Sequence, residues 1–107
     1  MSNNPEDLKL ATLAMATMAR SGSSSAAALR DKTGRTYVAI PVASDGFEID
    51  ALLSVLVVAK ASQITGIEAI VIAGDKPDLS SQAVIASEDA TAKLFMVDSV
   101  GLLLALN

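Results

Sequence analysis

The stretch 26-AAALRDKTGRTYVAIPV-42 decides the fold of this chain. Two runs of apolar and β-branched residues flank the turn 31-DKTG-34, and this arrangement is typical of an antiparallel hairpin. Pro41 has no backbone N–H to give to a sheet, so we expect a strand edge or a strand end at that position.

A helix is predicted on either side of this hairpin. Over residues 5–21, Pro5 and the acids after it suit a first turn, and apolar residues then recur at spacings of three and four. The segment 51-ALLSVLVVAKASQI-64 is apolar on all sides, which predicts a helix buried against a sheet. The acids of 44-SDGFEID-50 are interpreted as the charged start of that helix.

Strands and helices alternate in the second half of the chain. We predict a buried strand over 67–73, a short helix over 79–88 and a strand over 93–97, followed by an apolar tail over 100–107. The resulting order, α-β-β-α-β-α-β, predicts an α/β fold with a three-layer α/β/α sandwich and one mixed sheet. The length of 107 residues indicates a single domain, residues 1–107.

Composition narrows the possible functions. The chain is 51% apolar, 19% charged and only 3% aromatic, and its net charge of −4 includes no basic run. Nucleic acid and membrane surfaces are therefore not expected as partners. Cysteine is absent and histidine is absent. This absence excludes disulfides, thiolate nucleophiles, imidazole catalysis and any ordinary zinc site.

No segment of the sequence is typical of a secretory signal or a membrane span. The N-terminal residues MSNNPEDLKLA lack a basic region followed by an apolar one. The longest apolar-rich run, 51-ALLSVLVVA-59, is too short to cross a bilayer. We therefore expect a cytoplasmic protein.

The element order and the stretch 26–42, followed by a helix, resemble the small cytidine deaminases and their superfamily. In that family the second helix opens with Cys-Ala-Glu or His-Ala-Glu, which gives one zinc ligand and the glutamate that shuttles protons. The third helix opens with Pro-Cys-x-x-Cys, which gives two more ligands around an activated water.

The resemblance places these motifs on five residues of this chain. Leu52 stands at a zinc-ligand position and Ser54 at the position of the glutamate. The proline of the second motif is kept as Pro77, whereas its two cysteines are replaced by Asp78 and Ser81. One carboxylate and one hydroxyl do not hold zinc usefully, so no cofactor is expected.

A second motif of the family is lost as well. Its ribose-gripping Asn-x-Glu falls on Pro41 and Ala43. The resemblance therefore implies a degenerate member, a pseudoenzyme that keeps the fold without the zinc site. Without zinc, water stays near its bulk pKa and hydrolytic deamination has no nucleophile.

The remaining polar residues each have two interpretations. Asp45, Glu48 and Asp50 lie at the mouth of the family's site if the resemblance holds. They are interpreted as a helix start, with a site for a cationic ligand or divalent ion as the alternative. Asp78, or the serine two residues later, is expected to cap its helix, and binding of an amine or cation is the alternative. Ser54 is expected to permit close packing, with pocket lining as the alternative.

Three functions remain open from the sequence. The favoured one is a non-catalytic, oligomeric interaction or regulatory module, in which the tail 100–107 offers an apolar interface. The resemblance implies a homo-oligomer, a dimer or a tetramer. The alternatives are a protein that binds a nucleoside or other small ligand in the remnant pocket, and a metal-free enzyme that uses Asp78 or the acids of 45–50.

Overall fold

The computed structural model describes residues 4–107; residues 1–3, part of the stretch considered above for a secretory signal, lie outside the described residues. The helices are α1 (Pro5–Ser21), α2 (Ala51–Ala61) and α3 (Leu79–Glu88). The strands are β1 (Ser25–Asp31), β2 (Thr36–Ala39), β3 (Val42–Ser44), β4 (Phe47–Ile49), β5 (Ile67–Gly74), β6 (Lys93–Val97) and β7 (Leu103–Ala105).

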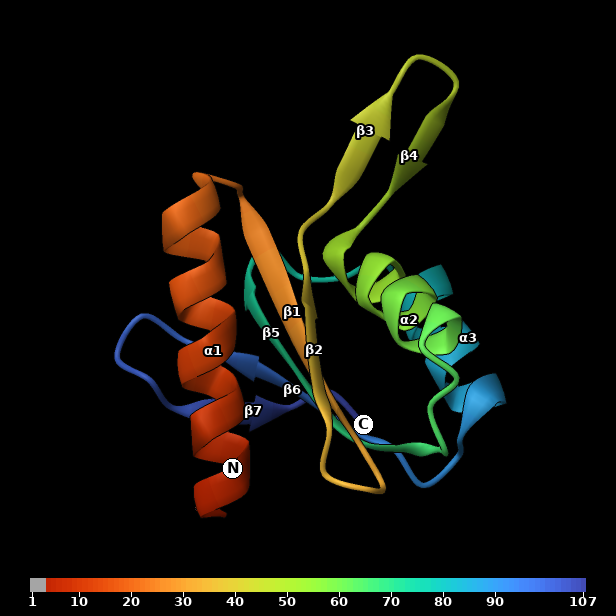
Figure 1. Cartoon of the computed structure of the whole chain (residues 1–107). Coiled ribbons are helices and arrows are strands. Elements are labelled where there is room, and N and C mark those ends of the chain that lie inside the picture. The colour runs from red at the N-terminus through yellow and green to blue at the C-terminus, as the bar shows by residue number, and fades with distance from the viewer. Residues whose placement is uncertain (1–3) are drawn as a thin grey trace.

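One five-stranded sheet forms the centre of the molecule, in the order β2-β1-β5-β6-β7 (Figure 1). The predicted hairpin is confirmed, because β1 pairs antiparallel with β2, and Leu29 lies opposite Tyr37. β1 also pairs antiparallel with β5, β5 pairs parallel with β6, and β6 pairs antiparallel with β7. The sheet is therefore mixed, as predicted.

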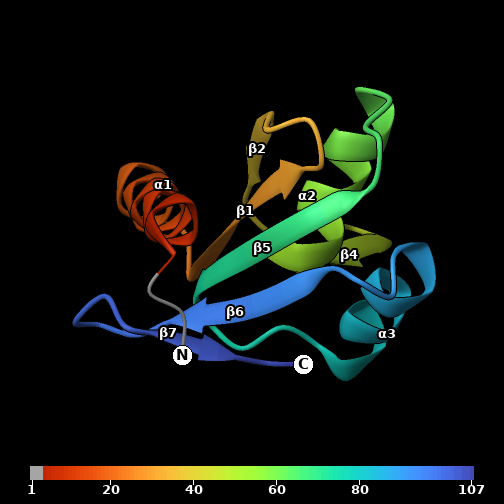
Figure 2. The same cartoon turned by 90° about the horizontal axis from the view of Figure 1, so that it is seen from below.

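Helices cover both faces of this sheet, with α1 on one side and α2 and α3 on the other (Figure 2). The alternation of side chains along β1 shows how the layers form. Ala27 and Leu29 pack into the cluster that contains α2, whereas Ala28 packs into the cluster that contains α1. The predicted α/β/α sandwich is thus confirmed.

The segment before α2 was assigned wrongly from the sequence. β3 and β4 form a separate antiparallel hairpin that projects from the body of the molecule (Figure 1). Asp45 lies in its turn with Gly46, whose φ of 83° suits glycine, and Glu48 lies on β4. Of the three acids, only Asp50 stands at the start of the helix. Pro41 lies between β2 and β3, in agreement with a strand end.

The apolar tail is also more structured than predicted. Its residues 103–105 form β7, and the buried Leu103 packs under the sheet face that α1 covers. The Asn107 side chain accepts a hydrogen bond from Leu94 N (3.0 Å) and donates one to Ala92 O (2.7 Å). The tail therefore extends the sheet beyond β6, because its backbone groups find partners along that edge.

Asp89, which follows α3, stabilises the start of β5 through hydrogen bonds and an ion pair. Its carboxylate accepts hydrogen bonds from the Thr91 hydroxyl and from Ile67 N (3.0 Å), and it pairs with Lys32 Nζ at 3.0 Å. These contacts, with the Thr91 hydroxyl contributing most, hold the pKa of Asp89 well below its usual range.

Within residues 4–107, none of the helices has the length and apolar character to cross a membrane.

Candidate functional site

A cavity of about 490 Å³ lies where α2 and α3 begin. We call it the helix-start cavity. Ser25 of β1 and Ile72 of β5 line it from the sheet, and Ala43 lines it from β3. The cavity therefore sits at the end of the sheet from which β5 leads into α3, a place where α/β proteins commonly bind ligands.

The structure brings most of the site residues predicted from the sequence to this cavity, but not all. Five of them line it: Glu48, Asp50, Leu52, Pro77 and Asp78. Ser54 and Ser81 are buried on α2 and α3 and are not among the lining residues, and Asp45 lies away in the β3–β4 turn.

The carboxylate of Asp50 joins the starts of the two helices. Its Oδ1 accepts a hydrogen bond from Leu53 N at 2.9 Å and caps α2. Its Oδ2 accepts a hydrogen bond from Asp78 N at 2.9 Å, at the N-cap position of α3. Two oxygens of one side chain therefore satisfy free N–H groups of both helices. We call this pair of contacts the Asp50 bridge.

Asp78 does not cap α3 in the way the sequence predicted. It occupies the N-cap position, but its side chain makes no capping hydrogen bond. The start of α3 is held from outside the helix by the Asp50 bridge, and from within it by Gln82, whose side-chain amide donates to Pro77 O at 3.2 Å. Asp78 is instead one of the residues that line the helix-start cavity.

Several lining residues were missed by the sequence interpretation. The cavity is also lined by residues next to the ends of β1 and β5, namely Ser24, Asp75 and Lys76. Ser25, which carries a hydroxyl group, is buried and lines the cavity from β1. The signal for Asp75 and Lys76 was present, because they directly follow a buried strand. Ser24 and Ser25 gave no signal, since they belong to a serine-rich loop whose end becomes a strand only through pairing with β5.

The residues that the resemblance assigns to the family's zinc positions do not fit zinc. Leu52 is fully buried in the core cluster beneath α2 and offers only hydrocarbon. Ser81 is 4% exposed and does not line the cavity, which leaves Asp78 as the single anionic donor among these three positions. Throughout residues 4–107 no three Asp or Glu side chains are grouped closely enough to hold a metal ion.

Comparison with known proteins places the chain in a family. The model of a family described as cytidine deaminase-like matches residues 3–101. The chain belongs to this cytidine deaminase-like family. No curated protein matches the sequence.

Solved structures show the same fold. The cytidine deaminase from Mycobacterium leprae, known from a crystal structure, is 14% identical in sequence to this chain. The superposition covers 91% of this chain and 90% of that protein, with a TM-score of 0.70. The cytidine deaminase from Bacillus anthracis is 13% identical in sequence, and its superposition covers 96% of this chain and 84% of that protein, with a TM-score of 0.69. At this identity the likeness establishes the architecture and not the activity.

Proposed function

We propose that this protein is a non-catalytic member of the cytidine deaminase-like family that works as a homo-oligomeric interaction or regulatory module. The observation that carries the proposal is the Asp50 bridge beside the buried Leu52. A carboxylate hydrogen bond joins the two helix starts that the family joins through a metal. The fold can therefore be kept without the metal.

The chemistry of the available side chains supports this proposal. Hydrolytic deamination needs an activated water and a group that moves protons. The position that the resemblance assigns to the proton-shuttling glutamate holds Ser54, which is buried outside the helix-start cavity. A neutral serine hydroxyl is a poor proton carrier near neutral pH.

The outer face of α2 supports the oligomeric part of the proposal. The helix is apolar on all sides, yet Val57 is 56% exposed and Val58 is 40% exposed. A helix of this kind is best stabilised when both of its faces are covered. We infer that a second copy of the chain covers Val57 and Val58, which gives a symmetric contact between α2 helices.

Sedimentation velocity and multi-angle light scattering test the oligomer. The wild-type protein should be a dimer or tetramer, and Val58→Lys should shift it to the monomer. Leu8→Lys on α1 is the matched control, because Leu8 is also 40% exposed but lies on the opposite side of the sheet. A wild-type protein that stays monomeric at all concentrations, or a Val58→Lys variant that assembles normally, would contradict the proposal.

The helix-start cavity supports a second candidate function, the binding of a small ligand. Its volume of about 490 Å³ falls in the usual range for ligand pockets, about 300–1,000 Å³. A panel of cytidine, uridine and related nucleosides should then raise the melting temperature. Ala43→Leu, on the exposed wall of the cavity, should remove this effect. Melting curves that do not move for any nucleoside would rule out this candidate.

A further inference from the structure

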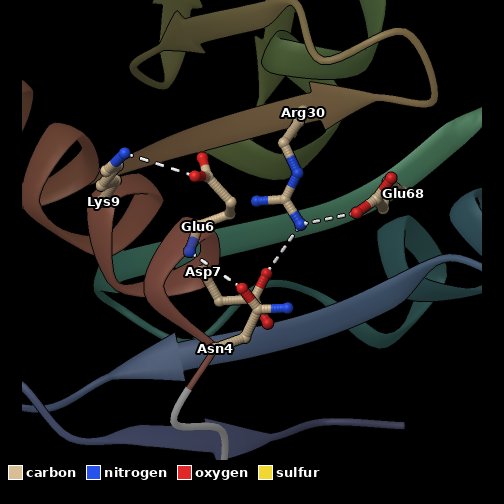
Figure 3. Close-up of polar contacts among 6 residues, drawn as sticks. All are labelled: Asn4, Glu6, Asp7, Lys9, Arg30 and Glu68. Carbon is tan, nitrogen blue, oxygen red and sulfur yellow. Dashed lines mark hydrogen bonds and ion pairs between the residues drawn. The ribbon is translucent and has the colours of Figure 1, made fainter.

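Arg30 is a buried cation on β1, and it lies apart from the helix-start cavity. Its side chain is only 7% exposed. The Nη2 nitrogen donates to Asp7 Oδ1 at 2.8 Å and to Glu68 Oε1 at 3.0 Å, so it binds α1 and β5 at once (Figure 3). Burial works against the charged form, but the bonds and charges of Asp7 and Glu68 prevail and raise the pKa of Arg30.

The other terminal nitrogen of Arg30, Nη1, is buried and has no hydrogen-bond partner. Figure 3 shows that it points away from Glu68, toward the first turn of α1 where Glu6 lies. Glu6 is not its partner in this structure, and the Glu6 carboxylate pairs with Lys9 at 3.3 Å. Buried polar groups are almost always hydrogen-bonded, so an unpartnered guanidinium nitrogen indicates an acceptor that is missing from the chain itself.

A cavity of about 370 Å³ adjoins Arg30, between α1 and the β1–β2 turn. We call it the α1 cavity. Leu10, Leu13 and Ala16 of α1 give it an apolar wall, and Thr36 lines it from β2. Glu6 and Lys9 also line it, and their side chains are 59% and 75% exposed. Such exposed side chains can turn aside and admit a ligand to Nη1.

The charges around Arg30 favour an uncharged acceptor over an anionic one. Its single positive charge faces the two carboxylates of Asp7 and Glu68, which leaves one net negative charge. The opposite charges of Glu6 and Lys9 cancel each other. A third carboxylate would therefore be repelled, whereas an uncharged oxygen accepts from Nη1 without that cost.

We propose that the α1 cavity binds a small apolar molecule that carries an uncharged carbonyl oxygen. The oxygen accepts from Arg30 Nη1, and the apolar part packs on Leu10, Leu13 and Ala16. The size of the cavity agrees with a compact ligand of this kind, near the lower end of the usual range of about 300–1,000 Å³.

Three probes of equal chain length test this proposal: hexanamide, hexanoate and hexylamine. Each is titrated into the isotope-labelled full chain, and the side-chain signals of Arg30, Leu10 and Leu13 are followed by NMR. Hexanamide should give saturable shifts at all three residues. Hexanoate and hexylamine should bind at least about tenfold more weakly, since the first is repelled by the carboxylates and the second has no acceptor.

Ala16→Leu tests the location of binding, because it fills the cavity without touching the Arg30 ion pairs. It should weaken hexanamide binding by about tenfold or more, as a clash on one wall of a small pocket would. Ala19→Leu, at an exposed position of the same helix, should leave binding unchanged. The proposal is overturned if hexanamide gives no saturable shifts, if hexanoate binds as tightly, or if Ala16→Leu binds normally.

Discussion

Replacing Asp50 separates the two roles of its carboxylate. Asp50→Ala removes both the α2 cap at Leu53 N and the contact with Asp78 N. Loss of an N-cap costs about 1 kcal/mol. Loss of a second, partly exposed hydrogen bond to a charged acceptor costs about 1 kcal/mol more. We expect Asp50→Ala to lower the free energy of unfolding by about 2 kcal/mol.

Asp50→Asn should fall between the wild type and the alanine variant. The amide oxygen can still accept from Leu53 N, but its NH₂ group meets the N–H donor of Asp78, so the second contact is lost. We expect a loss of about 1 kcal/mol. The difference between the two variants isolates the α2 cap.

Asp78→Ala is the matched control. Asp78 joins the Asp50 bridge only through its backbone, and its side chain makes no capping bond. Its loss should therefore cost no more than about 0.5 kcal/mol. Urea unfolding followed by far-UV circular dichroism measures all three variants. The reasoning fails if Asp50→Ala costs no more than Asp78→Ala.

Two further changes test other parts of the fold. Gly74→Ala should cost about 3 kcal/mol, because φ is +88° and a Cβ would lie 2.2 Å from Ser24 O. Gly22→Ala, at φ +69° with open space, should cost only about 1 kcal/mol, and equal losses in urea unfolding would contradict this reasoning. Asp89→Asn should be clearly less stable than the wild type at pH 7. Because the folded pKa of Asp89 is lowered, that difference should shrink as pH falls below about 4, and a pH-independent difference would refute it.

The sequence predicted the main layers well because they depend on local patterns. Helix α1 begins at Pro5 and ends before Gly22, as Pro5, the acids after it and the apolar spacing indicated. The β1–β2 hairpin followed from its turn and its two apolar runs. The helix of residues 79–88 was also found with the bounds that the structure gives to α3.

The errors arose where one pattern had two physical meanings. The Asp45-Gly46 pair is a typical two-residue hairpin turn, but the acids around it were interpreted as a helix start. The tail became β7 because the edge of β6 offered backbone partners, which its own residues do not reveal.

The candidate site was predictable in location but not in its contacts. Pro77 and the buried strand before it marked the end of the sheet where a site would lie. That Asp50 reaches Asp78 N could not be predicted, since 28 positions of sequence separate the two residues. The buried pairing of Arg30 with Asp7 and Glu68 was missed for the same reason, because only the fold brings these residues together.

Zinc content and deaminase activity, measured on one preparation, test the loss of the metal site most directly. The chain is expressed with excess zinc, purified, analysed by mass spectrometry of its metals, and then incubated with cytidine while uridine is quantified. We predict far less than one zinc per chain and no uridine above the protein-free control. One zinc per chain, together with cytidine conversion that a chelator abolishes, would contradict a non-catalytic protein built around the Asp50 bridge.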